Sequence, residues 1–491
     1  MKNKKILGPV FFIVLILVVA PYFIGKMAQE KIENHASQIT QMPGYTLKIT
    51  DYDQGWFTSH ATLSYGFDEH TLNILNKSAD KDVEFDTQTI NALQEGLVFD
   101  ITIAHGPVTF QRGISFSLLT MSGALRDIDH ESYRLFKEKA KISSLLDLFA
   151  TISYGGTASI TLHSPAFKAD YSDISGKKMI IDYAGMDIDA TINAAFDTYE
   201  AKAHINRLSI TMEDGTVILH EVVTHSSGDR LNDYIWTGNG TASIGEFNVT
   251  GPKNATFSLR NFTSDYDFNK ESDTALTLHW TSNAAAIETS DVKLKDFQLD
   301  MDMNHLDLEA VTDYVKSINE TYGTMNGEAP TPEKTAANMQ AIAARTGEKL
   351  IKGSPELIIH HLNFLMDDGF FKGDGIFSIN GEGLENIQEL SDPLTLNKRL
   401  AAVTNIKFNK AMAQALTAVG LKKQLAAGGM DISAMPKEQL DQMISIQTSA
   451  ALQTFILQGY LQSEGDDYFA HFDMKDGKRL INGKPLAIPG L

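Results

Sequence analysis

The chain has 491 residues, of which 43% are hydrophobic, so it can bury a sizeable core. Acidic residues outnumber basic ones by 62 to 42, which gives a formal net charge of −20. No stretch concentrates Lys and Arg, so the chain repels polyanions and nucleic acid is excluded as an expected partner. The sequence contains no cysteine, which excludes disulfides, thiolate metal ligands and a cysteine nucleophile.

The N-terminus predicts a membrane anchor. Three lysines, Lys2, Lys4 and Lys5, precede an uncharged apolar run from Ile6 to Ile24. At about 1.5 Å per residue, a helix of this length just crosses a hydrocarbon core of roughly 30 Å. Lysines before the run favour a cytoplasmic N-terminus and place the rest of the chain outside the cytoplasm. We therefore expect residues 1–25 to form a tail and a single-pass anchor, and residues 26–491 to form an extracytoplasmic region.

The region after the anchor begins with a helical pattern and continues as strands. Apolar residues at helical spacing between 27 and 39 predict an amphipathic helix that ends near Gly44. Strict alternation of apolar and polar residues then predicts strands over 45–49, 61–67, 97–103 and 186–196. Such clean alternation is typical of antiparallel sheets with one covered face. The alternation shifts phase within 203–210 and within 292–299, which predicts a bulge or a turn in each strand.

Helical periodicity returns in three blocks, near 131–149, 308–352 and 409–461. The chain ends in a pattern of two short strands around the turn at Asp476-Gly477. The predicted fold class is α+β. It is a β-rich, predominantly antiparallel, extended and curved sheet with helical insertions, preceded by one transmembrane helix.

Two aromatic residues and one histidine are the first candidate site residues. Trp56 and Phe57 follow Gly55, where one strand breaks and the next begins. We expect them to plug the end of the sheet, so that truncating either to alanine destabilises the fold by about 3–5 kcal/mol. A ligand-binding aromatic pair is the alternative. His105 continues the apolar face of its strand, and we expect a hydrogen-bonded core histidine rather than a buried acid–base residue.

The spacing of the other histidines does not predict a metal site. His220 and His225 are five residues apart in a strand-like segment, so they point to opposite faces, whereas a zinc protease needs a separation of four on a helix. His360 and His361 are neighbours in another strand-like segment and are likewise expected to diverge. The sequence therefore predicts no metal, no cofactor and no catalytic residues.

The order of motifs resembles that of the YdgA-like bacterial proteins. The matching segments are "YDQGWFTSHATLSY", "DITIAHGPVTF", "KGSPELIIHHLNFLMDDGFFKGDGIFSING" and "LINGKPLAI". The signature residues are Tyr52, Gly55, Trp56, Phe57, Ser59, His105, Gly106 and Pro107. The resemblance implies a protein anchored in the inner membrane of a Gram-negative-type bacterium, with its body in the periplasm. This family has no known function, so the resemblance brings no catalytic residues.

Three hypotheses of function remain open. The first is a non-enzymatic envelope protein that binds a lipid or another amphipathic ligand, because a sheet with one apolar face and few covering helices leaves a groove for acyl chains. The second is an envelope scaffold that acts through a protein partner or through self-association, with residues 436–461 as its contact helix. The third is a hydrolase whose site is assembled from dispersed residues.

We predict that the anchor is retained in the mature protein. The one candidate cleavage position, after Ala20, is followed by Pro21, which is a poor context for cleavage. Sequencing the N-terminus of the protein purified from membranes checks this. A mature chain that starts at Pro21, or anywhere after Ile24, contradicts the prediction.

Overall fold

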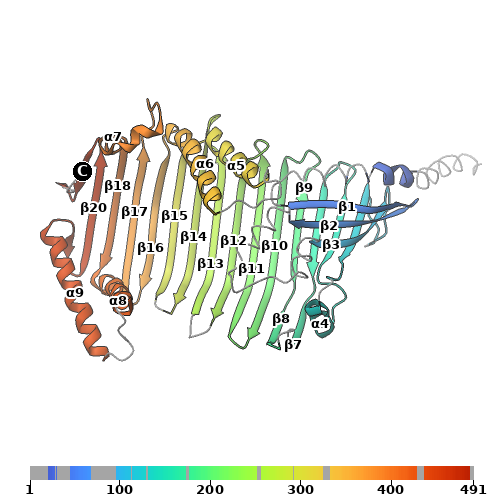
Figure 1. Ribbon diagram of the computed structural model, residues 1–491, viewed down its shortest axis with the longest axis horizontal. Coiled ribbons are helices and arrows are strands. Elements are labelled where there is room, and N and C mark those ends of the chain that lie inside the picture. Colours follow the sequence, from blue (N-terminus) through green and yellow to red (C-terminus); the bar gives the residue numbers. More distant parts are fainter. Residues whose placement is uncertain are drawn as a thin grey trace, which may run out of the picture. The chain divides into compact units, whose positions relative to one another are not determined.

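The computed structural model in Figure 1 describes residues 20–27, 29, 32, 45–67, 96–111, 113–128, 131–172, 176–251, 256–290, 292–323, 332–427 and 436–486. Residues 20–27 are helical, whereas the rest of the predicted anchor and most of the predicted amphipathic helix lie outside the described residues. Within these ranges, no helix is both long and apolar enough to span a membrane.

The chain forms two compact units. Unit 1 comprises Met1–Glu213, Val222–Trp236 and Val315–Gln340, and unit 2 comprises Asp214–Glu221, Thr237–Tyr314 and Ala341–Leu491. Each unit is built around antiparallel strands, with helices beside them, so the predicted β-rich α+β class is confirmed. The residues of β11 (Gly215–Arg230), which carry His220 and His225, are divided between the two units.

In the sheet of unit 1, most strands pair with the strand that comes next in the sequence. Its strands are β1 (Tyr45–Gln54), β2 (Thr58–Phe67), β3 (Leu97–His105), β4 (Leu119–Leu125), β5 (Asp147–Ile152), β6 (Ala158–Ser164), β7 (Phe167–Ser172), β8 (Lys178–Tyr183), β9 (Met186–Ile192) and β10 (Thr198–Met212). β1 to β6 pair in sequence, β6 pairs with β9, and β7 pairs with β8. β10 pairs with β9 over its first half and with β8 over its second half.

The two predicted phase shifts both correspond to irregular backbone. In β10, the shift falls between Ile205, the last residue paired with β9, and Leu208, the first paired with β8. In β15, the register against β16 shifts between Lys295 and Gln298, and Asp296 has a φ of 48°. Such a bulge moves the following side chains to the other phase.

Unit 2 is also a succession of antiparallel strands. They are β12 (Trp236–Thr250), β13 (Thr256–Lys270), β14 (Ala275–Thr289), β15 (Lys293–Asp307), β16 (Glu356–Met366), β17 (Gly369–Ile379), β18 (Leu400–Asn409), β19 (Gln462–Glu464), β20 (Asp467–Lys475), β21 (Lys478–Ile481) and β22 (Lys484–Pro485). β12 to β18 pair in sequence, and β18 then pairs with β20. The predicted strand pair around Asp476-Gly477 is observed as β20 and β21.

One predicted helical block is too long. The helix predicted near 131–149 is observed only as α4 (Glu131–Ala140), because Asp147 already begins β5. In β5 alternate residues, Leu148, Ala150 and Ile152, are buried, and this period of two overrides the apparent helical spacing. The other blocks are observed as α5 (Leu308–Gly323) with α6 (Pro332–Lys352), and as α8 (Lys410–Ala427) with α9 (Lys437–Leu457). η2 (Ile387–Ser391) and α7 (Pro393–Arg399) are short additional turns.

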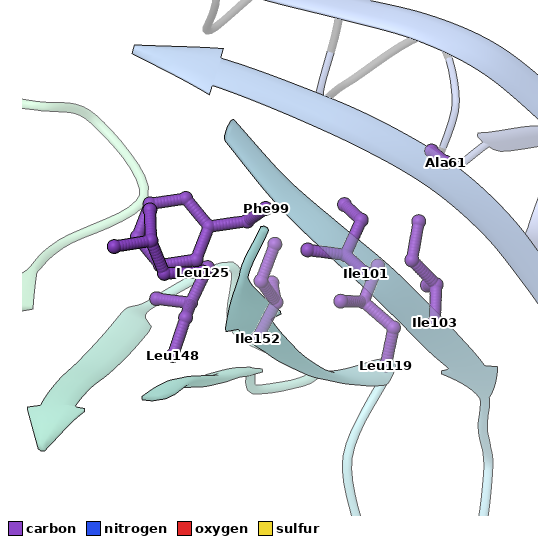
Figure 2. Packing of buried hydrophobic residues seen from close by; sticks show 8 residues of the cluster. All are labelled: Ala61, Phe99, Ile101, Ile103, Leu119, Leu125, Leu148 and Ile152. Carbon is purple, nitrogen blue, oxygen red and sulfur yellow. The ribbon is translucent and has the colours of Figure 1, made fainter. Parts of the chain in front are cut away.

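The main core of unit 1 lies on one face of β2 to β5 (Figure 2). Its buried residues are Ala61, Phe99, Ile101, Ile103, Leu119, Leu125, Leu148 and Ile152. Phe99, Ile101 and Ile103 share a face as their alternation predicts, and Ile103 and Leu119 are fully buried. Unit 2 has a smaller cluster, in which Met412 and Ala415 of α8 pack with Met366 of β16.

We predict that Ile103→Ala lowers the free energy of unfolding by about 2–5 kcal/mol, because it removes buried methyl groups and leaves a cavity. Ile180→Ala on β8 is the matched control, since the Ile180 side chain is substantially exposed and its truncation has a much smaller effect. Urea denaturation of both variants measures the difference. Equal shifts of the two midpoints contradict the assignment of Ile103 to the core.

Candidate functional site

The signature residues of the sequence gather at one end of the unit 1 sheet. Tyr52 lies near the end of β1, Gly55, Trp56 and Phe57 form the turn to β2, and Ser59 lies on β2. The register of β2 against β3 places Thr58 opposite Ala104 and Ser59 opposite Ile103. The turn therefore lies beside His105 at the end of β3.

His105 is the centre of this cluster. Its side chain is 2% exposed, and its Nε2 lies 2.9 Å from the Ser59 Oγ. Its Nδ1 lies 3.3 Å from the carbonyl oxygen of Trp56, and its backbone N–H donates to the carbonyl oxygen of Phe57 at 2.8 Å. The expectation of a buried, hydrogen-bonded histidine is confirmed. Burial lowers the pKa of His105, against the opposing effect of hydrogen bonds to the carbonyl oxygens of Trp56 and Pro21, and so favours the neutral ring.

The same cluster holds the helical residues 20–27. The Tyr52 hydroxyl donates to the carbonyl oxygen of Gly25 at 3.0 Å, and the Gln54 Nε2 donates to that of Tyr22 at 3.1 Å. The rings of Tyr22 and Trp56 lie 5.1 Å apart, centroid to centroid. Gly25 packs so closely on the imidazole of His105 that a Cβ there would overlap the ring. Tyr52, Gln54, Trp56 and His105 thus form a contact site, here called the seat, for the end of the predicted anchor.

Trp56 and Phe57 are not the buried plug that the sequence suggests. They are 50% and 53% exposed, so the expectation of burial is wrong. The turn directs much of each ring toward solvent, while the backbone of the turn makes the contacts to His105. Because half of each ring stays accessible, truncation destabilises the fold by less than the ~3–5 kcal/mol of a buried aromatic.

Gly106 and Pro107 start the loop from β3 to β4, joined by a cis peptide bond. The Gly106 N–H donates to the carbonyl oxygen of Leu118 at 2.7 Å. A Cβ at position 106 would overlap the carbonyl oxygen of Ser117, so the close approach of the two loop arms requires glycine. These two residues therefore shape the loop that follows His105.

Ser59 and His105 are residue types that can act as a nucleophile and a base, but the pair is not accessible to a substrate. The Ser59 side chain is fully buried, as His105 nearly is, so a substrate has no access to the Oγ. The strand interior and the seated helix enclose both side chains. This geometry favours a packing and positioning role for the pair.

A second feature of unit 1 is an apolar pocket of about 290 Å³. It is lined by Leu97, Leu125, Leu145, Leu146, Ser164, Phe167, Tyr183, Met186 and Leu208. It lies where β6 gives way to β7 and β8 to β9, and where β10 changes partner. Gly185, at the second break, has a φ of +94°, and a Cβ there would lie 3.1 Å from the carbonyl oxygen of Ser164.

The pocket has few polar groups, and those of Ser164 and Tyr183 are hydrogen-bonded. The Ser164 hydroxyl donates to the carbonyl oxygen of Leu145 at 2.8 Å. Burial raises the pKa of the Tyr183 phenol, and a hydrogen bond with Ser164 opposes this rise, so Tyr183 stays neutral near pH 7. Phe167 packs on Tyr183 and on Phe136 of α4, with ring centroids 5.1 Å apart in each pair. A neutral, apolar chain is the chemical class that such a lining accepts.

The sequence did not predict this pocket, although it contains one signal of it. The phase shift in β10 lies between Ile205 and Leu208, and Leu208 lines the pocket. A phase shift predicts a break in one strand. It does not predict that the breaks of neighbouring strands coincide, because coincidence depends on register across the sheet.

Unit 2 contains a histidine–aspartate cluster on β14 to β16. Asp302 lies 2.7 Å from His279 Nδ1 and 2.7 Å from His360 Nε2, and His361 Nδ1 lies 3.8 Å from Asp300. The expectation that His360 and His361 diverge is wrong, because a register shift between Ile359 and Leu362 sends both toward the two aspartates. Burial raises the pKa of Asp302, but hydrogen bonds from His360 and His279 outweigh this effect and lower the pKa overall. The hydrogen bond between His360 and Asp302 in turn raises the pKa of His360.

This cluster is a partly exposed set of ion pairs rather than a metal centre. Among the residues whose positions are described, no group of three or more His, Asp or Glu side chains is arranged to hold a metal ion. Exposed pairs of this kind contribute little to stability because water and salt screen them.

The chain matches a model of a known protein family. A family model described as bacterial protein of unknown function (DUF945) matches residues 3–489. No curated protein and no protein of solved structure shows significant similarity to the chain.

We predict that the advantage in stability of the wild type over His105→Gln shrinks as the pH falls from about 7.5 to about 5.5. The unfolded histidine gains a proton below its ordinary pKa of about 6.5, whereas the buried ring resists protonation. The contribution of neutral His105 is therefore present above that pH and lost below it. Melting temperatures of both proteins across this range measure the effect, and an advantage that grows on acidification would show that folded His105 is charged.

The companion variant His105→Asp tests the same site with a buried carboxylate. It destabilises unit 1 by several kcal/mol at pH 7, because an unpaired carboxylate must be desolvated or protonated there. His105→Gln, which keeps a neutral hydrogen-bonding group, melts closer to the wild type. The reverse order of the two melting temperatures would contradict the buried apolar setting.

Proposed function

Because the chain belongs to the bacterial family of unknown function DUF945, we propose a function from its site geometry. The protein is a non-enzymatic, membrane-anchored envelope protein that holds an acyl chain of a lipid, or a similar amphipathic ligand, in the apolar pocket of unit 1. The anchor is the segment Ile6–Ile24, the N-terminus is cytoplasmic and both units lie in the periplasm.

The membrane location is supported by the N-terminal sequence and by the seat for residues 20–27. The apolar run ends in the helical residues that Tyr52, Gln54 and His105 contact. The resemblance of the motifs to the YdgA-like proteins supports the inner membrane of a Gram-negative-type bacterium. An anchor whose end is fixed on the sheet orients unit 1 relative to the bilayer.

The lipid ligand is supported above all by the lining of the pocket. Its volume of about 290 Å³ is near the lower end of small-molecule sites, which run from roughly 300 to 1,000 Å³. It therefore suits one apolar chain segment rather than a whole lipid. Leu97 is exposed at the start of β3, which gives the pocket an edge open to solvent.

Assembly through α9 is a second candidate function, favoured by one observation in unit 2. Ile446, Phe455 and Leu457 of this helix are exposed, whereas Thr448 and Leu452 are buried. Exposed large apolar side chains on one helix are typical of protein contacts. We place this candidate second because its side chains form no enclosed site.

We predict that Leu97→Trp blocks the pocket and reduces the binding of a fluorescent fatty acid to the full chain in nanodiscs by about tenfold or more. The larger side chain at an exposed edge fills the pocket without disturbing the core. Met212→Trp is the matched control, because Met212 is comparably exposed and does not line the pocket. Equal fatty-acid affinities for the wild type and Leu97→Trp would overturn the proposed ligand site.

A further inference from the structure

Exposed apolar side chains are concentrated at one end of unit 1. Among the described residues of the sheet of this unit, the large apolar side chains that are half or more exposed are Trp56, Phe57, Phe110, Ile114, Phe116 and Tyr154. Phe110, Ile114 and Phe116 are the most exposed, at 70–74%. A monomer in water rarely gathers so many exposed apolar side chains without a partner surface.

The register of the strands places these residues at the same end of the sheet. Trp56 and Phe57 form the turn from β1 to β2, and the loop 106–118 joins β3 to β4 where His105 pairs with Leu119. Leu119 pairs in turn with Ile152, next to the turn that carries Tyr154. The Tyr154 hydroxyl donates to the carbonyl oxygen of Pro107, which joins the two loops directly.

The described residues of the loop between β3 and β4, 106–111 and 113–118, form a hairpin. Thr109 and Ser115 exchange two backbone hydrogen bonds of 2.9 Å, and the side chains of Thr109 and Ser117 are buried beneath the tip. The Gln111 Nε2 donates to the carbonyl oxygen of Thr102 at 3.0 Å. Gln111, next to the apex, thus holds the hairpin against β3, while Phe110, Ile114 and Phe116 stay exposed.

The hairpin stands next to the seat of the predicted anchor. Residues 20–27 contact Tyr52, Gln54, Trp56 and His105, and His105 is followed at once by the hairpin. Phe23 on these residues is exposed as well. The end of the sheet that contacts residues 20–27 is therefore the end that presents the exposed aromatic residues.

We propose that this end of unit 1 is a membrane-contacting surface, in which Phe110, Ile114 and Phe116 insert into the interfacial region of the lipid bilayer. The inference rests on the anchor of the proposed function. Aromatic residues favour the boundary between headgroups and acyl chains, and the mutual backbone bonds of Thr109 and Ser115 lower the cost of placing the hairpin there. Contact through anchor and hairpin together fixes the tilt of unit 1 on the membrane.

This surface also sets the position of the apolar pocket. Leu97 and His105 lie at opposite ends of β3, roughly 26 Å apart at about 3.3 Å per residue. The edge of the pocket therefore lies at the end of β3 opposite to the proposed membrane-contacting surface.

The absence of cysteine allows a direct test with single-cysteine variants of the full chain. Phe116→Cys carries an environment-sensitive dye at an exposed position of the hairpin. Glu213→Cys is the matched control, because Glu213 is exposed and follows β10 at the opposite end of the unit 1 sheet. Both proteins are reconstituted in vesicles of phosphatidylethanolamine and phosphatidylglycerol, some of whose acyl chains carry a quencher. We expect a blue-shifted emission and several-fold stronger quenching at position 116.

Each other outcome overturns the inference. Quenching at position 116 as weak as at position 213 means that the hairpin stays in water. A blue shift without quenching means that protein, either a second copy or another part of the chain, covers the tip. Ile114→Cys repeats the measurement if Phe116→Cys folds poorly. Flotation of the vesicles tests the anchor separately, and fatty-acid binding tests the pocket, so failure of the proposed function is distinguishable from failure of the inference.

Discussion

The contact between the buried ring of His105 and Gly25 is the interaction on which the arrangement of unit 1 depends. One side of the ring is bonded to Ser59 of β2, the other to the backbone of the turn at Trp56, and Gly25 closes over it. A single side chain thus joins the first hairpin, the end of β3 and the helical residues at the end of the apolar run. Because the ring is nearly enclosed, any side chain larger than glycine at position 25 would displace it.

The breaks in the strands are a second constraint, and they create the pocket. A continuous sheet would carry one apolar face from β6 to β10 without interruption. The interruptions after Ser164, after Tyr183 and after Ile205 fall side by side because of the register in which β6 to β10 pair. The apolar side chains around the breaks cannot close over one another, and the space of about 290 Å³ remains. The core cluster reaches this space through Leu125, which belongs to both.

Much of this fold is predictable from the sequence because alternation is a local signal. The strands around Phe99, Ile101 and Ile103, and the two phase shifts, follow from period two alone. The helix expected over 131–149 is wrong beyond Ala140 because a short apolar run fits both periods. The positions of Trp56 and Phe57 were predicted, but their exposure was not, since burial depends on what the fold brings opposite a turn. The pocket and the His279–Asp302–His360 cluster depend on register between strands, which one sequence does not encode locally.

The proposed membrane contact gives a physical reason for the exposure of Trp56 and Phe57. If the first turn plugged the sheet, its aromatic rings would be buried and its neighbours would be ordinary polar loop residues. Instead the next loop, 106–118, exposes Phe110, Ile114 and Phe116 on a base of buried hydroxyl groups. In water these side chains leave apolar surface hydrated, which is unfavourable by about 25 cal/mol per Å². At a lipid surface the same area is removed from water without any change in the fold. The end of the sheet that is least favourable in water is therefore the end that suits the membrane contact we propose.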